Sequence, residues 1–224
     1  MAGCGGFPSF PSLPPPLLPS DRPTTDIVQS NKRTDAHGGS IEKRARFGLD
    51  VTRAVISALD GDSKKVGMRL SPHSNFQGMG MKDSIPQFSH IVSELKKLDL
   101  AYLHLVESRV SGTSAVDAEY AAVTRENDPL VALWGTTAPI VLAGGFTPEK
   151  AKTVLGEVYT AENVTVAFGR AWISNPDLAY RIPRGIELSK WDRTTFYKKK
   201  SPDGYLDYPF SREWVEENGS GSKL

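Results

Sequence analysis

VLAGGF at residues 141–146 and VTVAFGR at residues 164–170 decide the fold of this chain. Each stretch is an apolar or β-branched run that ends in glycine and leads toward the start of a helix. Glycine at the end of a buried strand allows a backbone to approach a ligand closely. Successive strands that end this way match the phosphate site that β/α barrels form after their last two strands. Arg170 would supply a positive charge there, although two tight turns and a surface arginine explain the same spacing.

Helix and strand patterns alternate around these two stretches. We expect strands at residues 66–70, 100–106, 139–142 and 164–168, and helices that begin near Ser40, Ser84, Pro129, Thr147 and Pro176. Ser84 and Gln87 have the spacing of a capping box. The alternation predicts parallel strands joined by crossover helices. Four parallel strands cannot close a barrel, so we expect an open sheet with two unpaired edges.

Composition restricts the class of protein. The 224 residues suffice for one domain but fall slightly short of the ~250 typical of a closed β/α barrel. The 27 basic and 26 acidic residues nearly balance, which indicates no affinity for nucleic acid or membranes. Cys4 is the single cysteine, so cysteine-based metal sites and internal disulfides are excluded. Together with the lack of a membrane-spanning apolar run or secretory signal, this predicts a cytoplasmic protein.

The two ends of the chain differ from its middle in composition. Residues 1–30 contain seven prolines, which deny the segment helical and ladder hydrogen bonds. We expect a disordered, Pro-rich leader there, with a PxxP-type partner site as the alternative. A flexible tail is expected at residues 213–224. The domain between them spans residues 31–212.

Arg69 is the second charged candidate for a site. It lies near the end of an expected strand, and strand alternation places Gly67, Arg69 and Ser71 on one side. An arginine inside a parallel sheet is costly unless it meets an anion or a carbonyl group. The position therefore favours a ligand contact over a surface salt bridge.

Several ordered motifs together resemble the Old Yellow Enzyme family of flavin oxidoreductases, and its fungal branch in particular. They are NKRTDAHGGSIEKRARF (31–47), GMRLSP (67–72), AYLHLVE (101–107), the two glycine turns, ISNPDL (173–178), DRTTFY (192–197) and GYLDYP (204–209). The resemblance covers about residues 29–212. It implies an α/β fold: a partial (β/α)8 TIM barrel made of its last four strands with their helices.

The resemblance also implies a cofactor and a reaction. Family members bind FMN, take hydride from NADH or NADPH, and transfer it to the activated C=C bond of an α,β-unsaturated carbonyl compound. By motif, Arg69 resembles the arginine at the flavin ring. Gly144, Gly145, Gly169 and Arg170 resemble the phosphate cradle, with Gly145 standing where asparagine is more usual. Phe196 and Tyr197 resemble the aromatic pair beside the flavin and substrate.

The family's catalytic pair has no counterpart at the corresponding positions. The resemblance places its His/Asn or His/His pair upstream of residue 31, where this sequence has Pro15 and Leu18. The first tyrosine is Tyr102, so the family's tyrosine proton donor is also unmatched. No catalytic residue is therefore assigned, and the chain is expected to correspond to the barrel's second half.

The sequence leaves three functions open. The first is an ene-reductase of fungal secondary metabolism, truncated here, and the second is an inactive truncated member of the family. The third is a half-barrel that associates with itself or another half-barrel through its open edges. For the third we expect Val66, Met68, Leu103 and Leu105 to face water in a monomer. His104, inside an apolar strand, is expected to be a hydrogen-bonded core residue.

Overall fold

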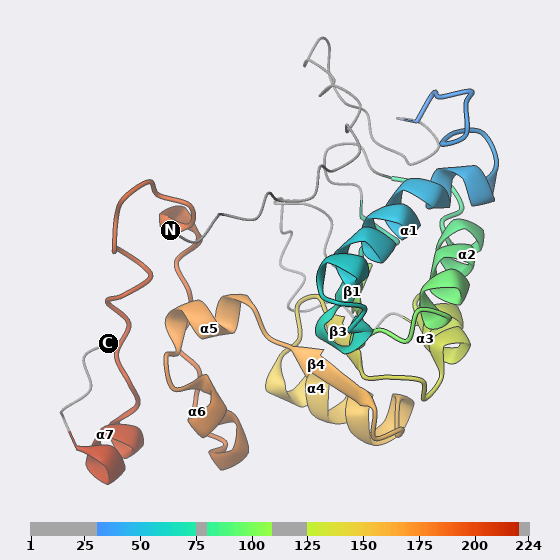
Figure 1. Cartoon of the computed structure of the whole chain (residues 1–224). Coiled ribbons are helices and arrows are strands. Elements are labelled where there is room, and N and C mark those ends of the chain that lie inside the picture. The colour runs from blue at the N-terminus through green and yellow to red at the C-terminus, as the bar shows by residue number, and fades with distance from the viewer. Residues whose placement is uncertain (1–30, 75–79, 109–124, 220–224) are drawn as a thin grey trace, which may run out of the picture.

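The computed structural model describes residues 31–74, 80–108 and 125–219. Helices and strands alternate along them as expected (Figure 1). The strands are β1 (Gly67–Leu70), β2 (Tyr102–Val106), β3 (Ile140–Ala143) and β4 (Val164–Ala167). The helices are α1 (Ile41–Ala58), α2 (Ile85–Lys96), α3 (Asp128–Trp134), α4 (Pro148–Thr153) with the π-helical turn η4 (Val154–Val158), α5 (Arg170–Ser174), α6 (Leu178–Arg184) and α7 (Arg212–Asn218), with short 3₁₀ turns η1 (Ser63–Lys65) and η5 (Arg193–Thr195).

The four strands form one parallel sheet in the order β1-β2-β3-β4. The predicted class, an α/β fold with the parallel strands of a partial barrel, is confirmed. Within the part of the chain that the structure describes, β1 and β4 are the edge strands. Arg69 of β1 is the register partner of His104, His104 of Val141, and Val141 of Thr165. These four residues form a row across one face of the sheet.

The opposite face of the sheet carries the core. Leu103, Leu105, Ile140 and Leu142 are fully buried there, and side chains of α1, α2 and α3 pack onto them. Because every second side chain of a strand points to the same face, the apolar residues gather under the helices. We call the described residues between 41 and 167 (41–74, 80–108 and 125–167), which contain this core, the β/α body.

One sequence expectation about this sheet is wrong. Val66, Leu103 and Leu105 were expected to face water, but they are buried, and Met68 is partly buried against the same core. The expectation assigned these residues to the open face, whereas they lie on the face that the helices cover. The open face carries Arg69 and His104 instead. It is therefore less apolar than a hydrophobic association surface would be.

Two helix starts show how local and tertiary contacts compete. Ser40 caps α1 as predicted, because its hydroxyl accepts from the backbone N–H of Lys43. The prediction of a capping box at Ser84 is wrong, since that side chain makes no capping hydrogen bond. Gln87 instead accepts from Arg44 Nε at 2.8 Å and donates to the carbonyl of Ile41 at 3.1 Å. The glutamine thus joins α2 to α1 rather than closing its own helix start.

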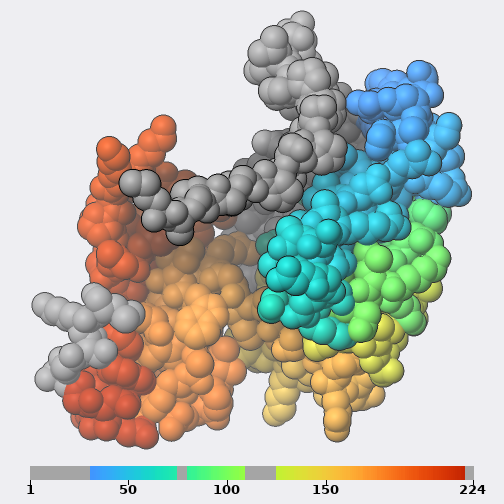
Figure 2. Space-filling view, in the orientation of Figure 1, coloured from blue at the N-terminus to red at the C-terminus, as the bar shows by residue number. Residues whose placement is uncertain are grey.

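The chain after β4 forms a second region, which we call the C-terminal segment (residues 170–218). In Figure 2 this segment, in orange and red, lies on one side of the molecule, and α1 to α3 lie on the other. The helix expected near Pro176 begins at Leu178, and α5 precedes it. Within the range where the tail is expected, residues 213–224, α7 extends to Asn218. Ser211 caps α7 and Phe210 stacks on Trp214 with ring centroids 4.2 Å apart.

The 30-residue leader lies outside the described residues, as do residues 220–224. No helix among the described residues is both long and apolar enough to cross a membrane.

Candidate functional site

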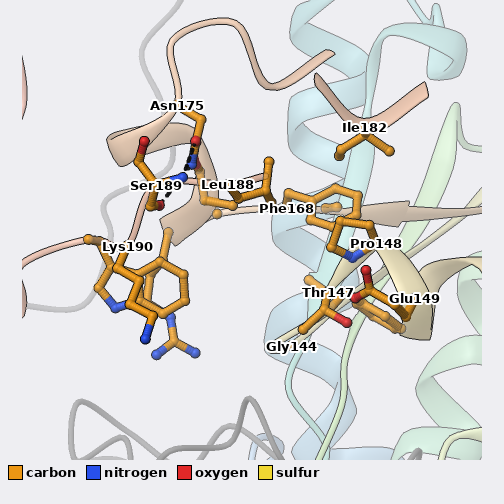
Figure 3. Close-up of a pocket in the computed structure, with 18 of the residues that line it drawn as sticks. Gly144, Thr147, Pro148, Glu149, Phe168, Asn175, Ile182, Leu188, Ser189 and Lys190 are labelled. Carbon is orange, nitrogen blue, oxygen red and sulfur yellow. Dashed lines mark hydrogen bonds between the residues drawn. The ribbon is translucent and has the colours of Figure 1, made fainter. Parts of the chain in front are cut away.

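A cavity of about 790 Å³ lies at the carboxyl ends of the strands. Its walls come from the strand ends, the loop after β3, the start of α5 and residues 185–197. All seven residues predicted to bind cofactor or substrate line it: Arg69, Gly144, Gly145, Gly169, Arg170, Phe196 and Tyr197. Figure 3 shows part of this lining, with Gly144 and Thr147 on one side and Ser189 and Lys190 on the other.

The loop after β3 requires glycine for two reasons. Gly144 has φ +133° and Gly145 has φ +66°, backbone conformations that residues with a side chain rarely adopt. A Cβ at Gly144 would lie 2.9 Å from Cβ of Glu107, so no side chain fits there. Glu107 is itself buried at the end of β2, and its Oε1 accepts from Asn127 Nδ2 at 3.1 Å. The loop backbone is therefore held against β2 and lines the cavity without side chains at these two positions.

The turn after β4 places a cation on the same cavity. Gly169 has open space around it, since no heavy atom lies within 4 Å of a Cβ built there. Arg170 follows as the first residue of α5 and is half-buried. Its guanidinium lies over the ring of Trp191, with Cζ 5.1 Å from the ring centroid. No pattern in the sequence indicates this contact between Arg170 and Trp191.

Arg69 and His104 stand side by side on the open face of the sheet. Arg69 is exposed, and both residues line the cavity. Burial lowers the pKa of His104, and the positive charge of Arg69 lowers it further. The imidazole is therefore neutral near pH 7. The expectation that His104 is a hydrogen-bonded core residue is wrong: its Nε2 is buried without a hydrogen-bond partner among the described residues.

Phe196 and Tyr197 form the aromatic part of the cavity wall. Their rings meet edge to face with centroids 6.4 Å apart, and Phe196 also contacts Tyr205. Tyr197 has φ +62° and a side chain that is 82% exposed. The Tyr205 hydroxyl accepts from the Tyr197 backbone N–H at 3.1 Å, which holds this unusual backbone conformation.

Residues 185–191, which we call the strap, close one side of the cavity. Asn175 is fully buried and bonds both backbone groups of Ser189: its Oδ1 accepts from the N–H at 2.7 Å, and its Nδ2 donates to the carbonyl at 3.2 Å (Figure 3). Ser174 donates a further hydrogen bond to the same carbonyl. Buried amides with such bonds fix a loop. The ISNPDL motif contains these residues, but its pattern alone does not indicate what they hold.

A buried ion pair anchors the strap and the chain after it. Arg181 Nε donates to Asp177 Oδ1 at 2.7 Å, and its Nη1 and Nη2 donate to the carbonyls of Glu187 and Pro209. Asp177 Oδ2 accepts from the backbone N–H of Ser211 at 2.8 Å and from its hydroxyl. Burial raises the pKa of Asp177, but the hydrogen bonds from Ser211 and Arg181 outweigh it, so the pKa is lower than usual.

Positive charge prevails around the cavity. Four lining residues are cationic, namely Arg69, Arg170, Lys190 and Arg193, against the carboxylates of Glu149 and Glu187. A cavity with this charge, a glycine loop without side chains and an aromatic wall is suited to an anionic ligand with a planar ring. No cluster of metal-ligating side chains occurs among the residues that the structure describes. His73, after β1, faces Glu126, with its Nδ1 3.8 Å from Oε2.

Several known proteins are similar in sequence to most of this chain. The chain is 47% identical over 193 residues to the probable inactive dehydrogenase easA of Claviceps purpurea, covering 84% of this chain and 49% of that protein. It is 46% identical over 194 residues to the chanoclavine-I aldehyde reductase fgaOx3 of Penicillium roqueforti, covering 87% of this chain and 50% of that protein. The chain thus spans about half the length of the curated relatives it matches.

Solved protein structures also resemble this chain. Old Yellow Enzyme from a Pichia species is 34% identical with a TM-score of 0.68, covering 82% of this chain and 45% of that one. Morphinone reductase in complex with tetrahydroNAD is 31% identical with a TM-score of 0.67, covering 87% of this chain and 47% of that one. The model of the NADH:flavin oxidoreductase / NADH oxidase family matches residues 27–189. The chain belongs to this family, which confirms the resemblance to Old Yellow Enzyme over part of the family's length.

Proposed function

We propose that this chain forms the FMN phosphate-binding part of an NAD(P)H-dependent oxidoreductase site of the ene-reductase type. The observation that carries the proposal is the convergence of Arg170, Gly169 and the Gly144–Gly145 loop on one cavity. Family membership supports flavin and nicotinamide use. Because the chain spans about half of its relatives, complete turnover is proposed for the complete site and not for these residues alone.

The residues of the cavity fit the phosphate end of FMN. Gly144 packs against Glu107 without room for a Cβ and also lines the cavity, so no side chain at this position stands between a phosphate and the loop backbone. Among the described residues, no carboxylate pairs with Arg170, so its charge is available to an anion. Gly145 carries no amide side chain, so this position would offer only its backbone N–H.

Other cavity residues would serve the ring and the substrate. Arg69 would stabilise negative charge on a reduced flavin ring, and the neutral His104 beside it would not add a second positive charge. Phe196 and Tyr197 would pack against the substrate. The chemistry that FMN supplies when bound is hydride transfer from NADH or NADPH to an activated C=C bond. An α,β-unsaturated carbonyl compound is the proposed substrate class, and an aldehyde reductase among the relatives supports a carbonyl substrate in fungal secondary metabolism.

A second candidate is a protein that binds flavin without catalysis. The names of relatives from Claviceps purpurea and Epichloe festucae, 47% and 48% identical, describe probable inactive enzymes. In this candidate the cavity and its charge are kept but turnover is lost. Association through the two open sheet edges is compatible with either candidate, since β1 and β4 present unpaired backbone groups within the described sheet.

The first experiment measures how strongly the phosphate contributes to binding. The full chain is titrated by equilibrium dialysis with FMN and, separately, with riboflavin, which has the same ring without the phosphate. We expect weak binding with an FMN preference of at least tenfold, and loss of this preference in Arg170→Ala. Arg193→Ala, at a more exposed cation of the same cavity, is the matched control. Equal affinity for FMN and riboflavin in the wild type would refute the phosphate assignment.

A second experiment separates the two candidates. The chain is assayed with FMN, NADPH and cyclohexenone, alone and together with the separately expressed N-terminal half of the Penicillium roqueforti relative. We expect the rate of free FMN for the chain alone and a higher rate with the added half. Turnover by the chain alone would contradict the half-site assignment, and no turnover in a mixture that binds FMN would favour the inactive candidate.

A further inference from the structure

Trp191 is the partner of the Arg170 guanidinium among the described residues. The guanidinium makes no hydrogen bond or ion pair to them, but lies over the indole ring at 5.1 Å. Both residues line the cavity. A cation above an indole face is attracted by the ring quadrupole and is restricted in its rotamers. The contact leaves the N–H groups of the guanidinium free to donate in the plane of the group.

The strap that carries Trp191 is held by a buried amide that also contacts α5. Asn175 binds both backbone groups of Ser189, two residues before Trp191, as Figure 3 shows. Its Nδ2 also donates to the carbonyl of Ala171, the residue after Arg170, at 2.9 Å. One fully buried side chain therefore connects the start of α5 to the strap. The positions of the arginine and of the ring beneath it are coupled through this amide.

We propose that Trp191 is a positioning residue that orients Arg170 toward the phosphate of the bound flavin. The inference rests on the proposed function, in which Arg170 meets that phosphate. A free arginine side chain loses rotamer freedom when it binds an anion, and this loss weakens binding. Stacking on Trp191 restricts the side chain before the ligand arrives, so less freedom is lost on binding. Trp191 itself does not need to touch the flavin.

The test compares substitutions of Trp191 by their effect on the FMN preference over riboflavin. Trp191→Leu removes the ring, and we expect it to reduce this preference by about five- to tenfold, as for one cation–π contact. Trp191→Phe keeps an aromatic face and should retain part of the preference. Trp172→Leu, at a tryptophan of α5 that is 47% exposed, is the matched control and should change nothing.

Riboflavin distinguishes positioning from a general structural defect. Damage to the cavity would weaken FMN and riboflavin alike, whereas loss of positioning weakens only the ligand with a phosphate. A double variant sharpens the test: in an Arg170→Ala background, Trp191→Leu should cause no further loss of FMN preference. An independent additional loss in that background would overturn the proposal.

The failures of the two proposals are distinguishable. If the wild type shows no FMN preference, or keeps it in Arg170→Ala, the proposed function fails at the phosphate and the inference fails with it. If the preference disappears in Arg170→Ala but is unchanged in Trp191→Leu, the proposed function stands and the positioning role of Trp191 is refuted.

Discussion

The β/α body and the C-terminal segment bury different kinds of side chain. In the body the buried residues are mostly aliphatic, with Leu103, Leu105 and Leu142 fully inaccessible. In the C-terminal segment they are mostly polar: Ser174, Asn175, Asp177, Arg181, Thr195 and Ser211, beside Ala171 and Leu178. Apolar packing tolerates small changes of shape, whereas a buried polar network depends on every partner. The cavity thus has one rigid apolar support and one wall that hydrogen bonds hold.

The largest expected effect is at the buried ion pair of the C-terminal segment. Asp177→Ala leaves the Arg181 charge and the Ser211 donors buried without their acceptor, so we expect a loss of about 3–5 kcal/mol in local stability. Asp177→Asn, which keeps an oxygen acceptor, should lose less. Urea unfolding followed by tryptophan fluorescence measures this directly, since three of the four tryptophans lie in this segment. Equal stability of Asp177→Ala and wild type would remove the contrast between the two regions.

The second-largest effect is expected in the β/α body, where truncation of a buried leucine leaves an empty space in the core. Leu142 is fully buried in β3 between Leu105 and Val166, so Leu142→Ala should cost about 3 kcal/mol in the free energy of unfolding. Val141→Ala, one residue earlier on the open face, is the matched control and should cost less than about 1.5 kcal/mol. Circular dichroism of the helices in urea is the measurement. Similar costs at both positions would mean that the two faces of the sheet are not distinct.

Acid should weaken the C-terminal segment selectively. The folded pKa of Asp177 is lower than its unfolded value of about 3.9. Its contribution to stability is therefore fully present above that value, and it is lost as the pH falls through the folded pKa. Tryptophan-detected urea midpoints between pH 6 and pH 2.5 should converge for the wild type and Asp177→Asn. A difference in urea midpoint between the two proteins that stays constant across this pH range would contradict a stabilising role for the ionised Asp177 carboxylate.

The smallest effect is expected at an exposed ion pair of the same segment. Arg212 and Glu216 of α7 are 2.6 Å apart, but their side chains are 87% and 60% exposed. Glu216→Gln should therefore change stability by less than about 0.5 kcal/mol. This variant is the control for Asp177→Ala, because both remove a carboxylate that binds an arginine four residues away. A loss of several kcal/mol here would show that charge alone, and not burial, supports the segment.

The body was more predictable than the C-terminal segment for a physical reason. Its strands have period-2 apolar patterns, and caps such as Ser40 and Thr147 act through contacts three residues away. These signals are local. The anchors of the segment are not local: Asp177 meets Ser211 across 34 residues, and Ser189 meets Asn175 across 14. No pattern in the sequence indicates such pairs.

The sequence by itself determined the parallel α/β fold, the family and seven of the residues that line the cavity, because glycine turns, strand periodicity and ordered motifs are local features of the chain. The tertiary structure alone decided which face of the sheet is open, since alternation separates two faces without saying which one the helices cover. It also decided that His104 lies beside Arg69 and that Trp191 lies beneath Arg170. Both contacts join segments that are distant along the chain: the first exists only once β1 and β2 pair, and the second only once the strap packs beside the start of α5.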